Sequence, residues 1–558
     1  MNVCEILLDL LDDYGVKYIF GIPGDAINEL TEAIRKQKRI KFIHVMHEES
    51  GAFAASAQAK LTGNLAVCVG TAGPGAIHLL NGLYDAKMDH APVLAITGQV
   101  ETGVIGRSYQ QEVNLQALFQ DVSVYNQTIF NAEQMPEAAT LAIQTALIRR
   151  GVSHLSIPSN ISKLKVPDYK KKKQIFHSQS LNRPSFNEIK RAAELLNASK
   201  KPCILAGIGA AGAVPELLKL AGLIKAPIIK ALRGKDIIPD NHPMTLGGTG
   251  LLGTEASVKA TNECDLFFVV GSDFPYAEFY PTSNARTIQI DRDGAHIGRR
   301  HPVDVALVGD TKLTLSELIP LLAEKRDDSF LKHCQGNMAS WRKKQEKLEH
   351  SNDLPIHPQT LARTISDLSA SDAIVVCDTG AVTLWGARNF QLKEKQRFTL
   401  SGALASMAYG MSAAIGAKLL FPEKQVIALC GDGGFAMLMC DFATAVKYKL
   451  AIKVFIFNNS KLGLIQMEQE ARAGHPEYET ELHNPDYTAF ALACGGEGFT
   501  IKHPNELTPT LTKVFASNKP CLINVFVNPE ELTMPPSINK SEVWNYLHAK
   551  VTEFFTAN

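Results

Sequence analysis

Two side chains with oxygen donors, Asp432 and Asn459, stand 27 positions apart in the sequence. Residues 425–430 and 452–457 are apolar runs typical of buried strands, and a helix is expected over residues 435–448 between them. Both side chains would then lie at the carboxyl ends of neighbouring parallel strands, where open α/β sheets bind cofactors. Because Mg²⁺ prefers oxygen ligands and completes its shell with phosphate oxygens and water, the pattern fits a diphosphate held through Mg²⁺.

Asp-Gly and Asn-Asn pairs also occur in ordinary turns, but the spacing and the flanking strands favour the metal site. Gly433 and Gly434 follow the aspartate directly. Their missing Cβ atoms would let backbone N–H groups approach a diphosphate.

With these motifs the chain resembles, over nearly its whole length, the thiamine-diphosphate enzymes that decarboxylate 2-oxo acids. The resemblance implies that Asp432, Asn459 and the main-chain carbonyl of Lys461 bind Mg²⁺. It also implies an α/β fold of three doubly wound parallel-sheet domains, in which pyrimidine and diphosphate domains flank a FAD-binding middle domain.

Length and composition agree with a multidomain protein that acts on small molecules. A chain of 558 residues is too long for one core. Its 57 basic residues balance its 57 acidic residues, so net charge gives no reason to expect nucleic acid as a partner. The ten cysteines include no Cys-x-x-Cys pair and are typical of reduced core residues. With no signal peptide or membrane-spanning run expected, we predict a cytoplasmic protein.

Alternating strand and helix patterns divide the chain into blocks. We expect a pyrimidine-binding domain over residues 1–165, a middle FAD-binding domain over 186–325 and a diphosphate and Mg²⁺ domain over 357–530, with a C-terminal tail helix over 531–558. The lysine-rich segment 170–173 is interpreted as a solvated linker. In the first block, strands are expected at residues 18–21, 41–46, 65–70, 92–97 and 154–157.

Glu48 begins a helix rich in small residues directly after an expected strand. An acidic residue at a helix start can simply complement the helix dipole. The resemblance implies instead that Glu48 is catalytic, because a carboxyl group against the cofactor pyrimidine relays the proton that activates it. Gly73 and Gly75, in the turn after the next strand, would let backbone approach the cofactor. His78 is expected to be a packing or hydrogen-bonded residue rather than a catalyst.

In the third block, Thr379 and Gly380 follow another expected strand and are implied to contact the cofactor. Met407 lies 25 positions before Asp432, in what we interpret as an alanine-rich helix. The resemblance makes Met407 the apolar residue that bends the cofactor into its reactive shape, although a methionine in such a helix is usually plain core. Thr379 replaces the valine expected in the family, which leaves its contact with substrate open.

The residues after the metal loop favour the pyruvate oxidase branch of the family. Where acetolactate-forming relatives usually carry a tryptophan, this chain has Met-Glu-Gln. The resemblance places Glu468 near the substrate and Leu464 and Ile465 at the cofactor. In the first block, Gln110 would donate to a substrate oxygen, whereas Glu112 would anchor its own loop.

The middle block carries Gly207-Ile-Gly209-Ala-Ala-Gly212, a pattern that alone is weak and often reflects tight packing. Together with residues 231–235, 249–253 and 271–276 it resembles the flavin-binding domain of pyruvate oxidases and quinone-linked pyruvate dehydrogenases, so FAD is expected rather than NAD. In this resemblance Gly209 approaches the flavin, Arg233 balances phosphate charge and Asp291 accepts from the ribose. The residues implied to contact FAD are Gly209, Arg233, Thr249, Gly250, Leu251, Leu252, Gly271, Phe274, Pro275, Tyr276 and Asp291.

The resemblance implies oxidative decarboxylation of pyruvate to acetate and CO₂, with electrons passed through FAD to a quinone. Alternatives are a phosphate- and oxygen-dependent oxidase that makes acetyl phosphate and hydrogen peroxide, an acetolactate synthase, and a non-catalytic member. A homo-oligomer, a dimer of dimers, is expected, with Glu48 of one subunit completing the metal site of its partner.

The C-terminal tail has apolar residues at helical spacing. This face would either contact the inner side of the cell membrane peripherally or pack on the enzyme's own surface. The residues concerned are Val543, Trp544, Leu547, Val551, Phe554 and Phe555.

Overall fold

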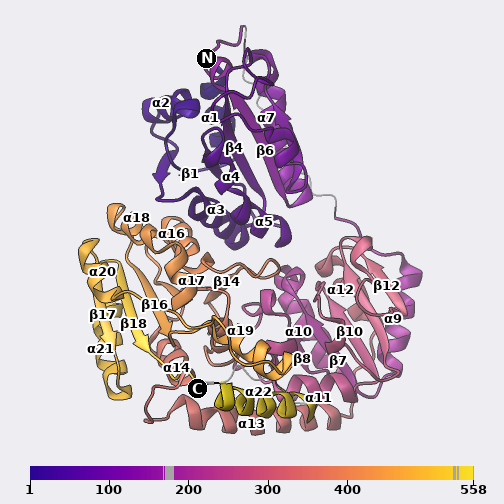
Figure 1. Ribbon diagram of the computed structural model, residues 1–558. Coiled ribbons are helices and arrows are strands. Elements are labelled where there is room, and N and C mark those ends of the chain that lie inside the picture. Colours follow the sequence, from indigo (N-terminus) through magenta and orange to yellow (C-terminus); the bar gives the residue numbers. More distant parts are fainter. Residues whose placement is uncertain (168, 170–180, 532–535, 537–539, 557–558) are drawn as a thin grey trace.

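The computed structural model describes residues 1–167, 169, 181–531, 536 and 540–556. These residues form three six-stranded sheets whose strand pairs are all parallel, with helices packed around each sheet (Figure 1). The predicted α/β class with three doubly wound sheets is confirmed. The predicted ranges 1–165, 186–325 and 357–530 each enclose one sheet, whereas the lysine-rich segment 170–173 lies outside the described residues.

The N-terminal sheet has the strand order β2-β1-β3-β4-β6-β5. Its strands are β1 Tyr18–Gly21, β2 Lys41–His44, β3 Ala66–Gly70, β4 Val93–Gln99, β5 Ser123–Thr128 and β6 Val152–Pro158. Its helices are α1 Val3–Asp13, α2 Asn28–Lys36, α3 Glu48–Thr62, α4 Pro74–His78, α5 Leu80–Met88, α6 Leu115–Leu118, α7 Met135–Arg149 and α8 Ser159–Ser162, with short η1 Asp25–Ile27 and η2 Ala132–Gln134. The five predicted strands are present. β5 was not predicted, because this edge strand is largely polar and only partly buried.

The C-terminal sheet repeats this order as β14-β13-β15-β16-β18-β17, so the first and third blocks share one plan. Its strands are β13 Ile374–Cys377, β14 Arg397–Leu400, β15 Val426–Gly431, β16 Ile452–Asn458, β17 Glu497–Ile501 and β18 Cys521–Phe526. Its helices are α14 Pro358–Leu368, α15 Ala381–Arg388, α16 Tyr409–Leu420, α17 Asp432–Met437, η9 Met439–Asp441, α18 Phe442–Lys447, α19 Gly463–Met467, η10 Glu468–Ala473, α20 Tyr487–Ala493, η11 Pro504–Glu506 and α21 Leu507–Ala516.

The middle sheet has a different order, β12-β11-β10-β7-β8-β9, in which the chain reverses direction across the sheet beside β7. Such a switch point opens a crevice at the carboxyl ends of the strands. The strands are β7 Pro202–Ala206, β8 Ile228–Lys230, β9 Thr245–Gly248, β10 Leu266–Val270, β11 Arg286–Asp291 and β12 Val305–Val308. The helices are α9 Phe186–Ala198, η3 Ile208–Ala213, α10 Val214–Ile224, η4 Leu232–Gly234, η5 Gly250–Leu252, α11 Glu255–Glu263, η6 Ala277–Phe279, η7 Gly294–His296, α12 Thr311–Leu318 and η8 Ile319–Leu321.

The single helix predicted over residues 435–448 is wrong, because the segment breaks into α17, η9 and α18. Leu438 leaves the helical region with φ −129° and ψ 26°. Asp441 then accepts a hydrogen bond from the Met46 backbone N–H of the N-terminal domain at 2.8 Å. The segment after the break is therefore in contact with a residue far away in the sequence.

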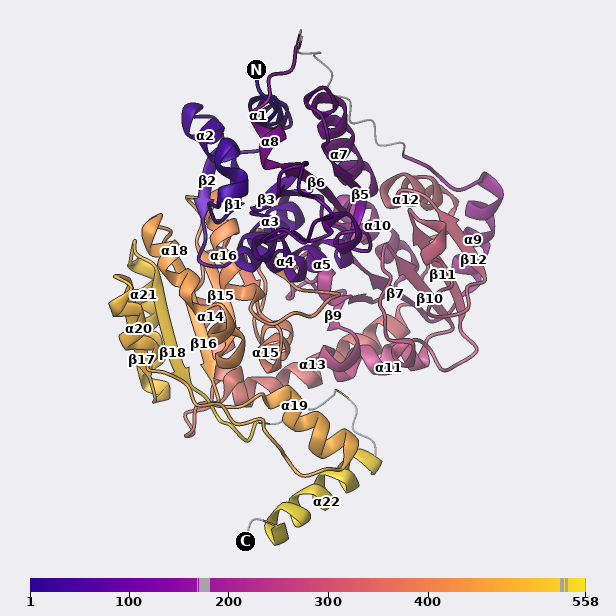
Figure 2. The ribbon, with the colours of Figure 1, turned by 45° about the horizontal axis from the view of Figure 1, so that its top comes forward.

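The three domains pack into one body. In Figure 1 the N-terminal domain lies above the other two, and α3 and α5 form its underside. α3 packs against α16 so closely that a Cβ atom on Gly416 would overlap the Ala54 backbone, and Phe53 meets Tyr409 edge to face at 5.7 Å. The long helix α13 Ser329–Glu349 contacts α11 of the middle domain and α14 of the C-terminal domain. Figure 2 shows the same arrangement tilted so that the top of Figure 1 comes forward.

The tail helix α22 Lys540–Thr556 packs against η10. Lys550 pairs with the fully buried Glu470 at 2.6 Å, and the Asn545 side chain donates to the Arg472 carbonyl. Within the described part of the chain, every helix is too short or too polar to cross a membrane.

Candidate active site

The predicted metal ligands lie at adjacent strand ends. Asp432 begins α17 after β15, and Asn459 follows β16, whose Phe457 is paired with Gly431. Asp432 is buried, and its Oδ2 atom accepts from the Ser460 backbone N–H at 2.8 Å and from the Asn484 amide at 2.7 Å. Burial raises the pKa of the Asp432 carboxyl to about 6, and these hydrogen bonds oppose the shift.

The two neighbouring asparagines have different surroundings. Asn458 is buried, donating to Asn524 at 2.9 Å and accepting from Asn484 at 3.1 Å. Asn459 lies in the following loop, where its Oδ1 atom accepts from the Lys461 backbone N–H at 3.2 Å. Both hydrogen-bonding groups of the Asn458 side chain are therefore used inside the domain. Asn459 is the asparagine whose side chain contacts Lys461, the other predicted ligand.

Beside this loop lies a carboxylate oxygen without a partner. Asp378 is fully buried at the end of β13, and its Oδ2 atom has no hydrogen-bond partner among the described residues. Burial raises the pKa of Asp378 to about 7. A Cβ atom on Gly434 would overlap this carboxylate, so only glycine fits there. The unsatisfied oxygen and the bare glycine backbone fit a site that expects a polar ligand.

Met407 borders the neighbouring glycine, Gly433. A Cβ atom on Gly433 would lie 3.4 Å from Met407 Cε and 3.0 Å from Leu462 and Leu482. The interpretation that Met407 lies within a helix is wrong, because α16 begins only at Tyr409. Ala408 has a left-handed conformation with φ 72°, and this turn separates Met407 from the helix. Thr379 and Gly380 lie close by in sequence to Asp378, in the turn that opens α15.

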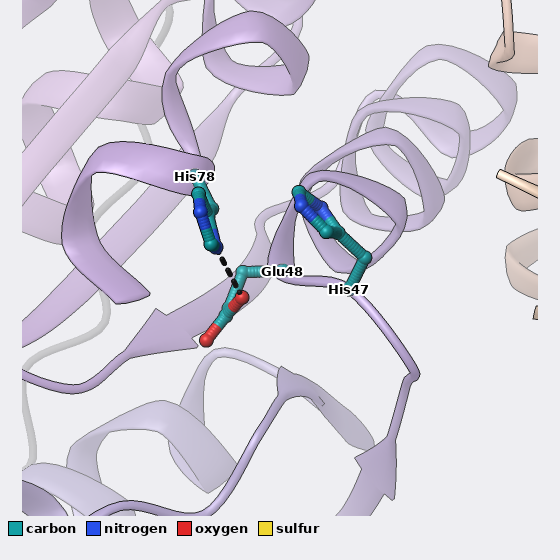
Figure 3. Close-up of side chains that lie close together, drawn as sticks. All are labelled: His47, Glu48 and His78. Atoms are coloured by element: carbon teal, nitrogen blue, oxygen red, sulfur yellow. Dashed lines mark hydrogen bonds and ion pairs between the residues drawn. The ribbon is translucent and has the colours of Figure 1, made fainter. Parts of the chain in front are cut away.

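Glu48 starts α3 and is almost completely buried. Its Oε2 atom lies 3.0 Å from His78 Nδ1, and the His78 ring stacks on the His47 ring at 4.4 Å (Figure 3). A Cβ atom on Gly75 would lie 3.0 Å from Glu48 Oε1. The prediction that His78 is hydrogen-bonded is confirmed, and its partner is the predicted catalytic acid.

The loop that carries Gln110 packs against the glycine turn beside Glu48. Gly73 has φ 65°, and a Cβ atom there would lie 2.9 Å from the Gln111 carbonyl. Gln110 itself is exposed. Glu112 accepts from the Tyr109 backbone N–H at 3.0 Å, so the expectation that this residue anchors its loop is confirmed.

Glu468 is partly exposed, unlike the buried Glu48 and Asp432. Its side chain is 44% exposed and lies 3.8 Å from Arg472, one turn along η10. Leu464 and Ile465 lie in the preceding helix α19, where Ile465 is also exposed.

The predicted flavin residues gather at the carboxyl edge of the middle sheet. Gly209 and Gly271 are in backbone contact, because a Cβ atom on Gly209 would lie 2.8 Å from Gly271 Cα. Gly250 has φ 74°, and a Cβ atom there would lie 2.8 Å from the Phe274 ring. The other predicted contacts lie in the same loops, at Thr249, Leu251, Leu252, Pro275 and Tyr276.

Asp291 lies at the end of β11, with Oδ1 3.4 Å from His296 Nδ1. Ligand atoms of His296, Asp273 and His90 lie within 4.8 Å of one another, which joins the N-terminal domain to this edge. Burial raises the pKa of Asp291.

Arg233, which is predicted to balance phosphate charge, forms an ion pair with another residue of the protein. Its Nε atom lies 3.1 Å from Asp89 Oδ1 of the N-terminal domain, and its Nη2 atom donates to the Asp89 carbonyl at 2.6 Å. In residues 249–253, which are also predicted to contact flavin, the carbonyls of Leu251 and Gly253 accept hydrogen bonds from Arg388 of the C-terminal domain, both at 2.8 Å. Both loops of the middle domain are therefore held by its neighbours.

Sequence reasoning missed Asn484 and Tyr487. Asn484 donates to Asp432, and the Tyr487 hydroxyl bonds the Asp432 carbonyl at 3.1 Å. Both come more than 50 residues after the aspartate, in a stretch without a recognisable motif. Only the fold brings them to the predicted metal ligand Asp432.

Three family models match this chain. They are the N-terminal TPP binding domain of thiamine pyrophosphate enzymes over residues 1–118, their central domain over 189–318 and their C-terminal TPP binding domain over 378–525.

Curated relatives match almost end to end. A Bacillus subtilis protein with a provisional thiamine pyrophosphate-containing designation, YdaP, is 41% identical over 99% of this chain and 96% of its own. The pyruvate oxidase of Lactiplantibacillus plantarum is 33% identical over 93% of this chain and 88% of its own. The acetolactate synthase large subunit of Lactococcus lactis is 31% identical over 95% and 93%. The chain therefore belongs to the thiamine pyrophosphate-dependent enzyme family.

Proposed function

We propose that this enzyme catalyses the oxidative decarboxylation of pyruvate to acetate and CO₂, using thiamine diphosphate, Mg²⁺ and FAD, and passes the electrons to a quinone. The observation that carries the proposal is the assembly at the edge of the middle sheet. Residues scattered from Gly209 to Asp291 come together there, and glycines without room for a Cβ atom line the backbone. A relative named as a pyruvate oxidase supports the oxidation of pyruvate.

The donor set beside β15 and β16 fits the diphosphate and its metal. Asp432, Asn459 and the Lys461 carbonyl would hold Mg²⁺, because a carboxylate and two carbonyl oxygens leave room for phosphate oxygens and water. Gly433 and Gly434 would present backbone N–H groups to the diphosphate. When bound, thiamine diphosphate supplies the electron sink for loss of CO₂, and FAD accepts two electrons.

Glu48 would hold and move the activating proton. His78 engages its Oε2 atom at 3.0 Å, while Oε1 faces the Gly75 backbone. One carboxylate oxygen is thus fixed within the protein, and the other is directed at a glycine turn that lets a ring approach. A carboxyl group in this position can exchange a proton with the aminopyrimidine.

Pyruvate would bind on the exposed side of this region, between the Gln110 loop and Glu468. Both side chains are accessible to solvent. We propose that Gln110 donates to a substrate oxygen and that Glu468 faces the reacting acyl group. Met407 would support the cofactor from below, next to Gly433.

We propose that the working enzyme is a homo-oligomer, a dimer of dimers. Among the described residues, no hydrogen bond or ion pair connects Glu48 with Asp432 or Asn459. A second subunit would supply the missing half of each site. A catalytically active monomer in analytical ultracentrifugation would contradict this assignment.

The tail helix supports a peripheral membrane contact. One side is seated on η10 through Lys550, while Val543, Trp544 and Leu547 are 48%, 71% and 54% exposed. Exposed aromatic and aliphatic residues on one helix are typical of interfacial segments. Val551, Phe554 and Phe555 lie in the described helix, but their side chains are not among those that the structure describes. A quinone dissolved in the membrane would be reached from such a position.

Product analysis tests the proposal against its alternatives. Purified enzyme with pyruvate should form acetate, and a quinone or artificial dye should support turnover much faster than oxygen, without added phosphate. Phosphate-dependent acetyl phosphate and peroxide would assign the chain to the oxygen-using oxidases. Acetolactate formed without acceptor reduction would assign it to the activity for which its Lactococcus lactis relative is named.

A further inference from the structure

At the junction of the three domains lies a buried charge network centred on α5 and the residue that follows it. Lys60 of α3 lies 2.7 Å from Asp85 Oδ2 and 2.7 Å from Asp89 Oδ2. The same ammonium group donates to the Leu400 carbonyl at the end of β14 and lies 4.4 Å from the centre of the Tyr409 ring. The side chains of Asp85 and Asp89 are 0% and 2% exposed.

Asp89 differs from Asp85 in its hydrogen-bond and ion-pair partners. Its two carboxylate oxygens accept from the backbone N–H groups of Gly402 and Ala403, both at 3.0 Å. The Asp89 Oδ1 atom also pairs with Arg233 of η4, and Arg233 donates a second hydrogen bond to the Asp89 backbone carbonyl. Asp85 bonds only Lys60 and the Ser56 hydroxyl among the partners identified.

The two segments that Asp89 joins belong to different predicted cofactor sites. Arg233 lies in the loop 231–235, one of the proposed flavin loops. Gly402 and Ala403 begin the turn that leads to Met407, whose side chain borders Gly433 of the diphosphate site. A Cβ atom on Gly402 would overlap the Arg233 side chain, so the two segments also touch directly.

Burial alone would raise the pKa of the Asp89 carboxyl, but Lys60 and Arg233 outweigh burial and hold it below its ordinary value. Asp89 is therefore an anion enclosed by two cations and two backbone donors. Charge-assisted hydrogen bonds of this kind are stronger and more directional than neutral ones. Removing the charge would leave the cations without their shared partner.

We propose that Asp89 is a positioning residue that fixes the flavin loop against the turn leading to Met407, and so sets the relative position of the two cofactors during electron transfer. The assignment rests on the proposed function for the identity of the cofactors. The mechanical claim, that one carboxylate joins the two segments, concerns the protein alone. Asp85, which shares Lys60 but reaches neither segment, provides a matched control.

The first arm of the test is amide hydrogen exchange measured by mass spectrometry on cofactor-free protein, so it is independent of catalysis. Asp89→Asn should accelerate exchange in both 231–235 and 401–407 by about tenfold or more, the loss expected for hydrogen bonds to a charged group. Asp85→Asn should leave both segments within about threefold of wild type. Equal acceleration by the two variants, or no acceleration in one segment with Asp89→Asn, would overturn the proposal.

The second arm is stopped-flow reduction of the bound flavin by pyruvate, with exchange of the thiazolium C2 proton measured in parallel. Asp89→Asn should slow flavin reduction by about tenfold or more, and to a greater degree than it slows C2 exchange. Equal slowing of both steps would contradict a role in relative positioning. Failure of wild-type flavin to be reduced would refute the proposed function, while the exchange arm would still decide the mechanical claim.

If Asp89→Asn does not fold, Arg233→Met carries the test. It removes the guanidinium but leaves Lys60 paired with both aspartates. Exchange should then rise in 231–235 only, because Asp89 still accepts from Gly402 and Ala403. Unchanged exchange in 231–235 would overturn the proposal.

Discussion

Replacement of Asn484 by alanine tests whether the residues around Asp432 form a metal site. The Asn484 amide donates to Asp432 Oδ2 at 2.7 Å and to Asn458 Oδ1 at 3.1 Å. Only the first of these bonds reaches a carboxylate, and it fixes the orientation of a predicted ligand. A hydrogen bond to a charged group contributes about 1.5–3 kcal/mol.

At about 1.4 kcal/mol per tenfold, that loss corresponds to Mg²⁺ binding roughly 10- to 100-fold weaker in the presence of thiamine diphosphate, the range typical of residues that orient metal ligands. The Ser460 backbone N–H continues to hold the carboxylate, so binding should weaken rather than vanish. Isothermal titration of Mg²⁺ into the enzyme with saturating thiamine diphosphate measures the change.

Asn524→Ala is the matched control. Asn524 bonds the same Asn458 from the other side, at 2.9 Å, and the hydrogen bonds identified for it do not include Asp432. Its Mg²⁺ affinity should stay within about threefold of wild type. If Asn484→Ala binds Mg²⁺ as wild type does, or if both variants lose affinity equally, Asn484 does not orient a metal ligand.

Three further predictions concern the rest of the site. Burial raises the pKa of Asp378 to about 7, so the folded protein keeps a proton that the unfolded chain releases from about pH 4 upward. The free energy of unfolding should therefore decrease as the pH rises from about 4 to about 7. The thermal midpoint of cofactor-free Asp378→Asn relative to wild type should therefore increase between about pH 5 and about pH 8, and a pH-independent difference would disprove the shift. Glu48→Gln should retain Mg²⁺ and thiamine diphosphate but lose at least about 100-fold in C2 proton exchange, whereas Glu49→Gln should not; exchange at the wild-type rate in Glu48→Gln would exclude the relay. Replacing Trp544 and Leu547 by serine should reduce co-sedimentation with lipid vesicles without changing turnover with a water-soluble dye, and unaltered co-sedimentation would remove the tail from any membrane contact.

Local patterns predicted much of the fold because buried parallel strands are continuous apolar runs. β1 matches its predicted range, and β15 and β16 differ from theirs by one residue at the ends. β5 escaped prediction because its exposed edge position does not require apolar residues. The break at Leu438 was not predicted either, and the segment after it carries Asp441, which accepts a hydrogen bond from Met46, almost 400 residues earlier in the chain.

The residues of the candidate site also divide into those that local motifs predict and those that only the fold brings into place. Asp432 and Asn459 stand directly after strands, and Glu48 starts the helix that follows β2, so their place at a sheet edge follows from recognisable motifs in the sequence. Asn484 holds Asp432 from a distance of 52 residues without a motif. The partnership of Arg233 with Asp89 spans two domains, and only the packed structure shows that this arginine is already engaged.

The central claim is that this family member transfers electrons from pyruvate to a bound flavin. The most direct measurement is the visible absorption spectrum of the enzyme loaded with thiamine diphosphate, Mg²⁺ and FAD, recorded without oxygen before and after pyruvate is added. We expect the flavin absorption to bleach as CO₂ is released, and to return when a quinone is added. Consumption of pyruvate with the flavin spectrum unchanged would contradict the account and would favour a non-oxidative carboligation.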